Sequence, residues 1–309
     1  SFSSLFLYFY YMFSAKKRLD RAYKNAHIVP FNEDSKFILF SDCHRGDNSF
    51  ADDFANNRNI YFHALKHYFK EGFEYCELGD GDELWENINF ESILNAHKNV
   101  YLLMKRFHEE GKLHMIWGNH DMVYRNPKYV EKYLSSYFDA KTGEDVDLFC
   151  NIKYHEAIVL KHTKTNQELF LTHGHQADWW NYLFWKWSRF MVRVLWKPLN
   201  VMGIADPTSP AKNYKELIKV ERRTKKWISD NNNLMTIVGH THRPRFPEPG
   251  DIAFFNDGSC VHPRSITGIE IENGAISLIK WTIATQDDGT LRIIIRVLLE
   301  GPTKLSDYK

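Results

Sequence analysis

The chain of 309 residues lacks an apolar run long enough to cross a bilayer as a helix. Its most apolar stretch, residues 5–13, is too short, and Lys16, Lys17 and Arg18 follow it. Two interpretations stay open: a helix that packs on the domain, or an anchor that lies in a membrane interface. A secretory signal is disfavoured because the basic residues follow the apolar run. We expect a cytoplasmic protein, in solution or peripheral on the membrane.

The chain also lacks a charge excess and a close pair of cysteines. Its net charge is +1 with 26% charged residues, so no overall field attracts a specific nucleic acid. There is no internal repeat and no low-complexity tract, and the length allows one large domain, with or without an insertion. The four cysteines form no CxxC and lie in or beside strand-like runs, which indicates buried free thiols in a reducing compartment. They are Cys43, Cys76, Cys150 and Cys260.

The first half of the chain alternates strand and helix patterns. Residues 37–41, 74–78 and 113–117 are apolar strand-like runs, and residues 59–70 and 90–110 have helical spacing between them. This β-α-β-α-β order is typical of helices that flank a sheet. Further strands are predicted at residues 151–161, 168–172, 234–238, 252–256, 265–271, 275–282 and 291–299. The strands over residues 252–256, 265–271, 275–282 and 291–299 predict a second, antiparallel sheet packed on the first.

Polar clusters follow five of the predicted strands. The carboxyl ends of strands in open α/β folds are where binding sites form. A single histidine there would be an ordinary core or surface imidazole, but five such clusters are hard to explain as packing. Asp, Asn and His suit divalent ions such as Mn, Fe or Zn, and a shared carboxylate can hold two ions about 3.5–4 Å apart. The clusters contain Asp42 and His44; Asp80; Asn119, His120 and Asp121; His173 and His175; and His240 and His242.

In this order, D-x-H, GD, GNHD, a His beside Gly and GHxH resemble the calcineurin-like metallophosphoesterase superfamily, over about residues 37–264. The resemblance implies an α/β fold, a two-sheet β-sandwich flanked by helices, with two divalent metal ions at the strand ends. Mn²⁺ is the first candidate, with Fe or Zn as alternatives. The first metal would take Asp42, His44, Asp80 and His242. The second would take Asp80, Asn119, His173 and His240.

The same resemblance implies a hydroxide that bridges the metals and attacks a phosphoester or pyrophosphate. His120 would protonate the leaving group or stabilise the transition state, and Asp121 would fix its tautomer; a purely structural pair is the alternative. Asp82, Glu83 and His175 are candidates to support the ligands, and residues 256–259 would close the site. Four arginines close to the clusters are candidates to bind phosphate, with surface salt bridges as the alternative: Arg45, Arg125, Arg243 and Arg264.

Residues 179–233 form an insertion with eleven Lys or Arg against four Asp or Glu, a net +7. On a helical wheel, Lys186, Arg189 and Arg193 share one stripe opposite an aromatic face. A helical cap that binds an anionic, amphiphilic substrate is predicted, or a helix that lies on an anionic membrane. A solvated basic face over ordinary packing is the alternative.

Such a cap, together with GHTHRP at residues 239–244, resembles the UDP-2,3-diacylglucosamine pyrophosphatases. That family has Arg where this chain has His120, and an acidic residue where it has His175. The expected organisation is an N-terminal helical segment (residues 1–36), a metallophosphoesterase core (37–178 and 234–309) and the cap (179–233).

The predicted function is hydrolysis of a phosphorylated small molecule or lipid, in particular a lipid-linked or nucleotide diphosphate. The alternatives are a soluble phosphodiesterase or phosphomonoesterase acting on nucleotides or phosphoproteins, and a non-catalytic scaffold with the same fold.

Overall fold

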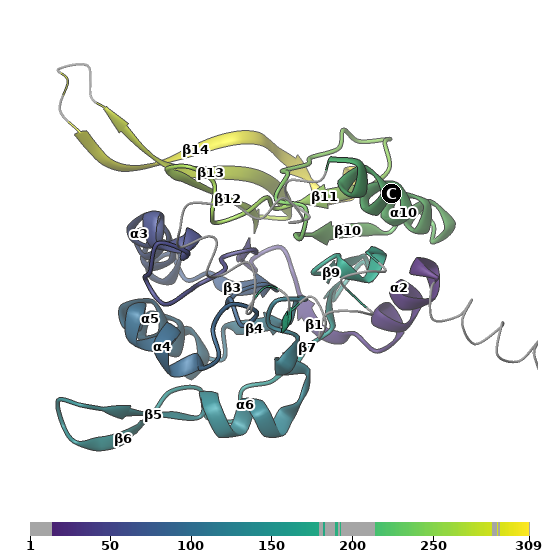
Figure 1. Ribbon diagram of the computed structural model, residues 1–309. Coiled ribbons are helices and arrows are strands. Elements are labelled where there is room, and N and C mark those ends of the chain that lie inside the picture. Colours follow the sequence, from purple (N-terminus) through teal and green to yellow (C-terminus); the bar gives the residue numbers. More distant parts are fainter. Residues whose placement is uncertain are drawn as a thin grey trace, which may run out of the picture.

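The computed structural model describes residues 14–178, 182, 189, 190, 192, 214–285, 289 and 291–308. Two sheets form its centre (Figure 1). The seven-stranded sheet has the order β14 (Leu291–Lys304), β13 (Ala275–Thr285), β12 (Ser265–Glu272), β2 (Phe37–Phe40), β3 (Glu74–Leu78), β4 (Leu113–Ile116) and β7 (Tyr154–His155). The five-stranded sheet has the order β1 (His27–Phe31), β8 (Ala157–His162), β9 (Glu168–Thr172), β10 (Met235–Val238) and β11 (Phe254–Asn256).

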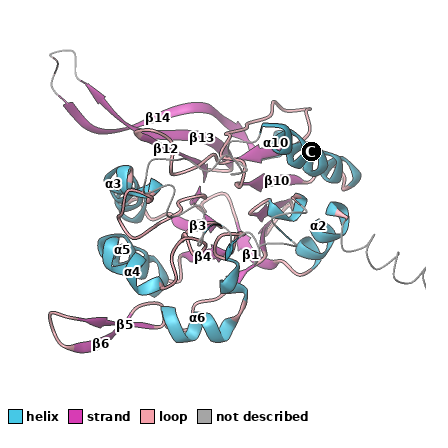
Figure 2. Ribbon diagram, viewed as in Figure 1, coloured by secondary structure: helices cyan, strands magenta, loops and turns pink. Residues whose placement is uncertain are grey.

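Helices cover the outer faces of both sheets (Figure 2). α3 (Arg58–Lys70), α4 (Phe90–Ala96) and α5 (Lys98–Glu109) pack on the seven-stranded sheet, and α2 (Ala15–Lys24) and α10 (Tyr214–Asp230) pack on the five-stranded sheet. The strand β2 is buried on both faces: Ile38 and Phe40 join the helix side, whereas Phe37 and Leu39 join the core between the sheets. A continuous apolar run is what a central strand of this kind requires. The predicted sandwich flanked by helices is confirmed.

Three details of the predicted sheets and helices were wrong. The C-terminal strands do not form a separate sheet, because β12 pairs antiparallel with β2 and extends the first sheet. The stretch 151–161 is two strands in different sheets, since β7 pairs with β4 and β8 pairs with β1 and β9. The helix expected over residues 90–110 is interrupted at His97, whose buried ring contacts the Asp52 carboxylate at 2.8 Å.

Several elements had no clear pattern in the sequence. β1 contains Pro30 and lies in the segment expected to be helical; it is an edge strand that pairs only with β8 in the described chain, a position that tolerates proline. The hairpin of β5 (Ser136–Asp139) and β6 (Glu144–Asp147) extends from the body beside α6 (Pro127–Leu134). Short 3-10 turns complete the described chain: η1 (Asp53–Asn56), η2 (Met122–Arg125), η3 (His175–Ala177) and η6 (Leu305–Asp307).

The predicted insertion is described only in part. α10 and four isolated residues before it fall within the described residues, whereas Lys186 and Arg193 lie outside them. Within the described part of the chain, no helix is both long and apolar enough to span a membrane. All four cysteines are free; Cys43, Cys76 and Cys260 are buried as expected, but Cys150 is exposed in a turn.

Candidate metal centre

The five polar clusters meet at one end of the two sheets. β2, β3 and β4 run parallel, as do β9 and β10, so each group delivers its carboxyl ends to one edge. Backbone hydrogen bonds join neighbouring loops, from Asp42 N to Gly79 O at 3.1 Å and from Gly239 N to His173 O at 3.0 Å. His240 N donates to Asp42 Oδ2 at 2.8 Å and ties one sheet to the other.

The residues of these clusters have an uncommon backbone conformation. Five of the seven predicted ligands have positive φ angles although none is glycine. Such conformations cost on the order of 1–3 kcal/mol each and persist only where the surrounding structure imposes them, which is typical of functional sites. The angles are 50° at Asp42, 48° at His44, 51° at Asp80, 64° at His240 and 54° at His242.

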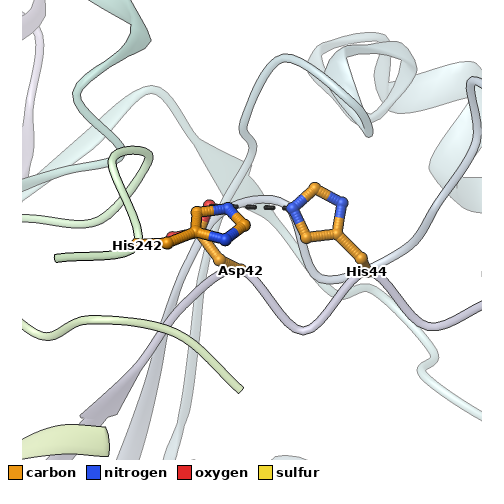
Figure 3. A group of neighbouring side chains, drawn as sticks. All are labelled: Asp42, His44 and His242. Atoms are coloured by element: carbon orange, nitrogen blue, oxygen red, sulfur yellow. Dashed lines mark ion pairs between the residues drawn. The ribbon is translucent and has the colours of Figure 1, made fainter. Parts of the chain in front are cut away.

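The first group is formed by Asp42, His44 and His242, which point toward one another in Figure 3. Asp42 Oδ1 lies 3.1 Å from His242 Nε2 and 3.8 Å from His44 Nε2. Asp42 is buried, whereas the side chains of His44 and His242 keep 12% and 19% of their surface. This side of the group therefore opens to solvent.

The second group is formed by Asp80, His173 and His240, all of them buried. His173 Nε2 lies 3.1 Å from Asp80 Oδ2 and 3.2 Å from Asn119 Oδ1. Its Nδ1 donates to Leu78 O at 2.8 Å, and such a bond directs the other ring nitrogen toward a metal. Asp80 Oδ2 is also 3.9 Å from His44 Nε2, so one carboxylate lies between the two groups.

Buried acceptor atoms without protein partners lie in the first group. Asp42 Oδ1 and His44 Nε2 are buried and have no hydrogen bond within the described chain, a condition that normally costs about 1–3 kcal/mol for each group. Burial by itself would raise the pKa of Asp42, but the neighbouring His242 and His44 together outweigh this effect. The pKa of Asp42 therefore lies well below its usual range. Carboxylate oxygens and imidazole nitrogens with free lone pairs match divalent transition metals. The residues therefore fit two metal ions.

His120 is held by Glu83, and the predicted role of Asp121 was wrong. The Glu83 carboxylate lies 2.8 Å from His44 Nδ1 and 2.8 Å from His120 Nδ1. Asp121 instead accepts the backbone N–H groups of Gly118 at 2.6 Å and Gly81 at 2.8 Å. Adjacent residues in a turn point in different directions, so Asp121 fixes the loops and Glu83 orients the imidazole.

Trp85 contacts both His120 and Asn119. Its ring stacks on His120 with centroids 4.0 Å apart, and its Nε1 donates to Asn119 O at 2.7 Å. Trp85 was not among the residues predicted from the sequence. Its position five residues after Asp80, on the same loop as Glu83, was the available signal.

Arg45 does not bind substrate from its observed position, which corrects the prediction. Its side chain is 1% exposed, and its guanidinium donates two hydrogen bonds of 2.7 Å to the Glu77 carboxylate. Its Nε donates to Asp82 at 2.8 Å. A buried carboxylate on β3 needs a buried cation, and Arg45 supplies it from the neighbouring loop.

The remaining predicted residues stay predictions. Arg125 is exposed at the end of η2, Arg243 and Arg264 are exposed on loops that follow the clusters, and Arg189 is half-buried. The predicted closing loop lies against the site, where Asn256 Nδ2 donates to Gly239 O at 2.7 Å.

Two further side chains adjoin the second group. Asp178, which was not predicted from the sequence, places Oδ2 3.4 Å from His240 Nε2. His175 is buried with both ring nitrogens unbonded within the described chain, and burial together with His173 and His240 lowers its pKa well below the usual value. Both residues follow His173 on one short turn, and this spacing was the only signal for Asp178.

Comparison with solved structures gives distant likenesses. No protein-family model matches the chain, and no curated protein sequence matches it. A predicted phosphoesterase from Streptococcus pneumoniae is 15% identical, with 85% of this chain and 97% of that chain covered and a TM-score of 0.35. Zinc-bound Vps29 from Entamoeba histolytica is 15% identical, with 86% and 99% covered and a TM-score of 0.36. A 5'-nucleotidase from Candida albicans is 12% identical, with 88% and 52% covered and a TM-score of 0.30. At these scores the likenesses assign no activity.

Proposed function

We propose that this chain is a dinuclear metal-dependent phosphohydrolase of the calcineurin-like type. The observation that supports this most strongly is the pair of ligand groups with Asp80 between them, whose Oδ2 lies 3.1 Å from His173 Nε2 and 3.9 Å from His44 Nε2. Several of the ligands are held in left-handed backbone conformations. Bound at these groups, two divalent cations would supply an activated water and neutralise the charge of a phosphate. Asp42, His44 and His242 would hold one cation, and Asp80, Asn119, His173 and His240 would hold the other, with Asp80 shared.

The chain's own acid–base group in this proposal is His120. Its Nδ1 is engaged by Glu83 and its ring by Trp85, so Nε2 is the atom left to exchange a proton with a leaving-group oxygen. Its side chain keeps 17% of its surface, so it is accessible from the side on which the first group opens. The Glu83 carboxylate contacts both His44, the proposed metal ligand, and His120, the proposed acid, and it therefore orients both rings.

The substrate that we propose is a lipid-linked or nucleotide diphosphate. Support comes from the basic, aromatic insertion of residues 179–233 and from the resemblance to the UDP-2,3-diacylglucosamine pyrophosphatases. We further propose Mn²⁺ as the metal and a peripheral position at the membrane surface, where a lipid-linked substrate would be found. Arg125, Arg243, Arg264 and Arg189 are the described candidates to bind its phosphates.

A substrate panel tests this proposal. Purified protein, stripped by a chelator and reloaded with Mn²⁺, is assayed against UDP-diacylglucosamine, a nucleotide diphosphate without lipid, and p-nitrophenyl phosphate. We expect metal-dependent hydrolysis, fastest on the lipid-linked diphosphate, and its loss in Asp80→Asn. An Asp251→Asn variant, altered at an exposed carboxylate, serves as the control. Hydrolysis that does not depend on metal would contradict the proposal, and equal rates on all substrates would contradict its lipid-linked part.

A further inference from the structure

Behind the first ligand group lies a buried chain of three side chains, Asp257, Ser41 and Asp42. Ser41 Oγ is 2.5 Å from Asp42 Oδ2 and 2.7 Å from Asp257 Oδ1. All three residues are 0% exposed. Ser41 directly follows β2 in one sheet, and Asp257 directly follows β11 in the other, so the chain connects the two sheets directly behind Asp42.

The number of protons in this chain is fixed by its geometry. A serine hydroxyl has one proton to donate, and an ionised carboxylate can only accept. Both oxygens that face Ser41 Oγ are carboxylate oxygens, and both lie at short hydrogen-bond distances. One of the two contacts therefore needs a second proton, and that proton resides on Asp42 or on Asp257.

The surroundings place the proton on Asp257. Asp42 Oδ2 already accepts from His240 N at 2.8 Å, and Asp42 Oδ1 faces His242 at 3.1 Å; both contacts favour an ionised carboxylate. Among the described residues, none offers a hydrogen bond to Asp257 Oδ2, which is buried.

We propose that Asp257 is a positioning residue, a neutral carboxylic acid that donates to Ser41 Oγ, which in turn donates to Asp42 Oδ2. With two donors on Oδ2, from Ser41 and from His240 N, the Asp42 carboxylate cannot rotate, and Oδ1 alone is presented to the first cation. This inference rests on the proposed metal centre, and it assigns a role to Asp257 that the ligand pattern does not contain.

The packing around the chain supports this fixed orientation. Gly239 lies against it so closely that an added Cβ would overlap Ser41 Oγ. Asn256, next to Asp257, holds the same loop through Gly239 O. Orienting partners of this kind typically change metal affinity by about 10–100-fold when they are removed.

A Mn²⁺ titration followed by calorimetry tests the role of the chain. We expect Ser41→Ala and Asp257→Leu to weaken the first site by about 10–100-fold, because neither can pass a hydrogen bond to Asp42. Asp257→Asn should bind close to wild type, because its amide can donate to Ser41 as the carboxylic acid does. Ser277→Ala, which alters another buried serine in a strand away from the site, is the matched control and should not change the affinity.

Infrared difference spectroscopy of the purified protein gives a second readout. Wild type minus Asp257→Asn should contain the carbonyl stretch of a protonated carboxylic acid at neutral pH. The absence of that band would overturn the inference, as would an Asp257→Asn variant that loses as much affinity as Asp257→Leu. A wild-type protein that binds no Mn²⁺ would overturn the metal centre and with it the positioning role. If the wild-type protein bound no Mn²⁺ but still gave the carbonyl band, the proposed metal centre would be wrong, whereas the protonated Asp257 and its hydrogen bond to Ser41 would stand.

Discussion

Two buried polar clusters lie side by side in this protein, and they differ in whether their hydrogen bonds are complete. In the first cluster, Arg45 donates hydrogen bonds to both Glu77 and Asp82. Tyrosine hydroxyls supply further donors to these carboxylates, from Tyr75 to Glu77 at 2.7 Å and from Tyr124 to Asp82 at 2.6 Å. All of its buried side-chain nitrogen and oxygen atoms have a partner. The second is the candidate metal centre, in which Asp42 Oδ1 and His44 Nε2 have no hydrogen bond within the described chain.

The difference distinguishes charges that stabilise the fold from those that we propose to bind cations. Burial alone does not distinguish them, because Arg45 and Asp42 are both buried. Sequence distance does not either, since Arg45 directly follows His44, and Asp82 is two residues from Asp80. A cluster whose donors and acceptors balance needs nothing more, whereas a cluster with free lone pairs at its centre is stable only at a cost that a bound cation can offset.

The largest expected effect tests the complete cluster. Arg45→Met leaves Glu77 and Asp82 buried without their cation, so we expect a loss of about 3–5 kcal/mol in the free energy of unfolding. Chemical denaturation measures it. Arg245→Met, which breaks an exposed pair with Glu221 at 3.4 Å, is the control and should cost less than about 1 kcal/mol. Similar losses in both variants would remove the distinction between the clusters.

The second prediction tests the incomplete cluster. Mn²⁺ at about 100 times its Kd should stabilise the wild-type protein by about 2.7 kcal/mol, because only the folded state gathers the ligands. Asp80→Asn should lose most of this gain, since the residue lies between both groups. Thermal unfolding with and without Mn²⁺ measures the gain, and Asp251→Asn should keep it. An equal gain in Asp80→Asn would show that the cation binds elsewhere.

The smallest change in stability is expected where the two clusters adjoin. Glu83→Gln should alter the free energy of unfolding by about 0.5–1.5 kcal/mol, yet lower kcat by about 10–100-fold. An amide accepts with one atom and donates with the other, so His44 or His120 must exchange its tautomer. Glu91→Gln, on an exposed helical position, is the control. If Asp121→Asn lowered kcat and Glu83→Gln did not, the assignment of Glu83 would be wrong.

The sequence by itself determined the strands that carry the polar clusters and the residue types at their ends. The strand predicted over residues 74–78 coincides with β3, and the strand over residues 168–172 coincides with β9. Buried parallel strands are short apolar runs, and their carboxyl ends meet at one edge for topological reasons. The order of strands and helices was therefore enough to place the clusters beginning at Asp42, Asp80 and Asn119 together.

Only the tertiary structure decided which side chains are partners. His120 contacts Glu83 and not Asp121, and Arg45 binds Glu77 and not a phosphate. Asp257 contacts Ser41, which is 216 positions away in the sequence and lies beside Asp42. The division of residues 151–161 between two sheets was decided in the same way. A local pattern encodes burial and periodicity, but a hydrogen bond joins whichever donor and acceptor the packed elements bring within about 3 Å.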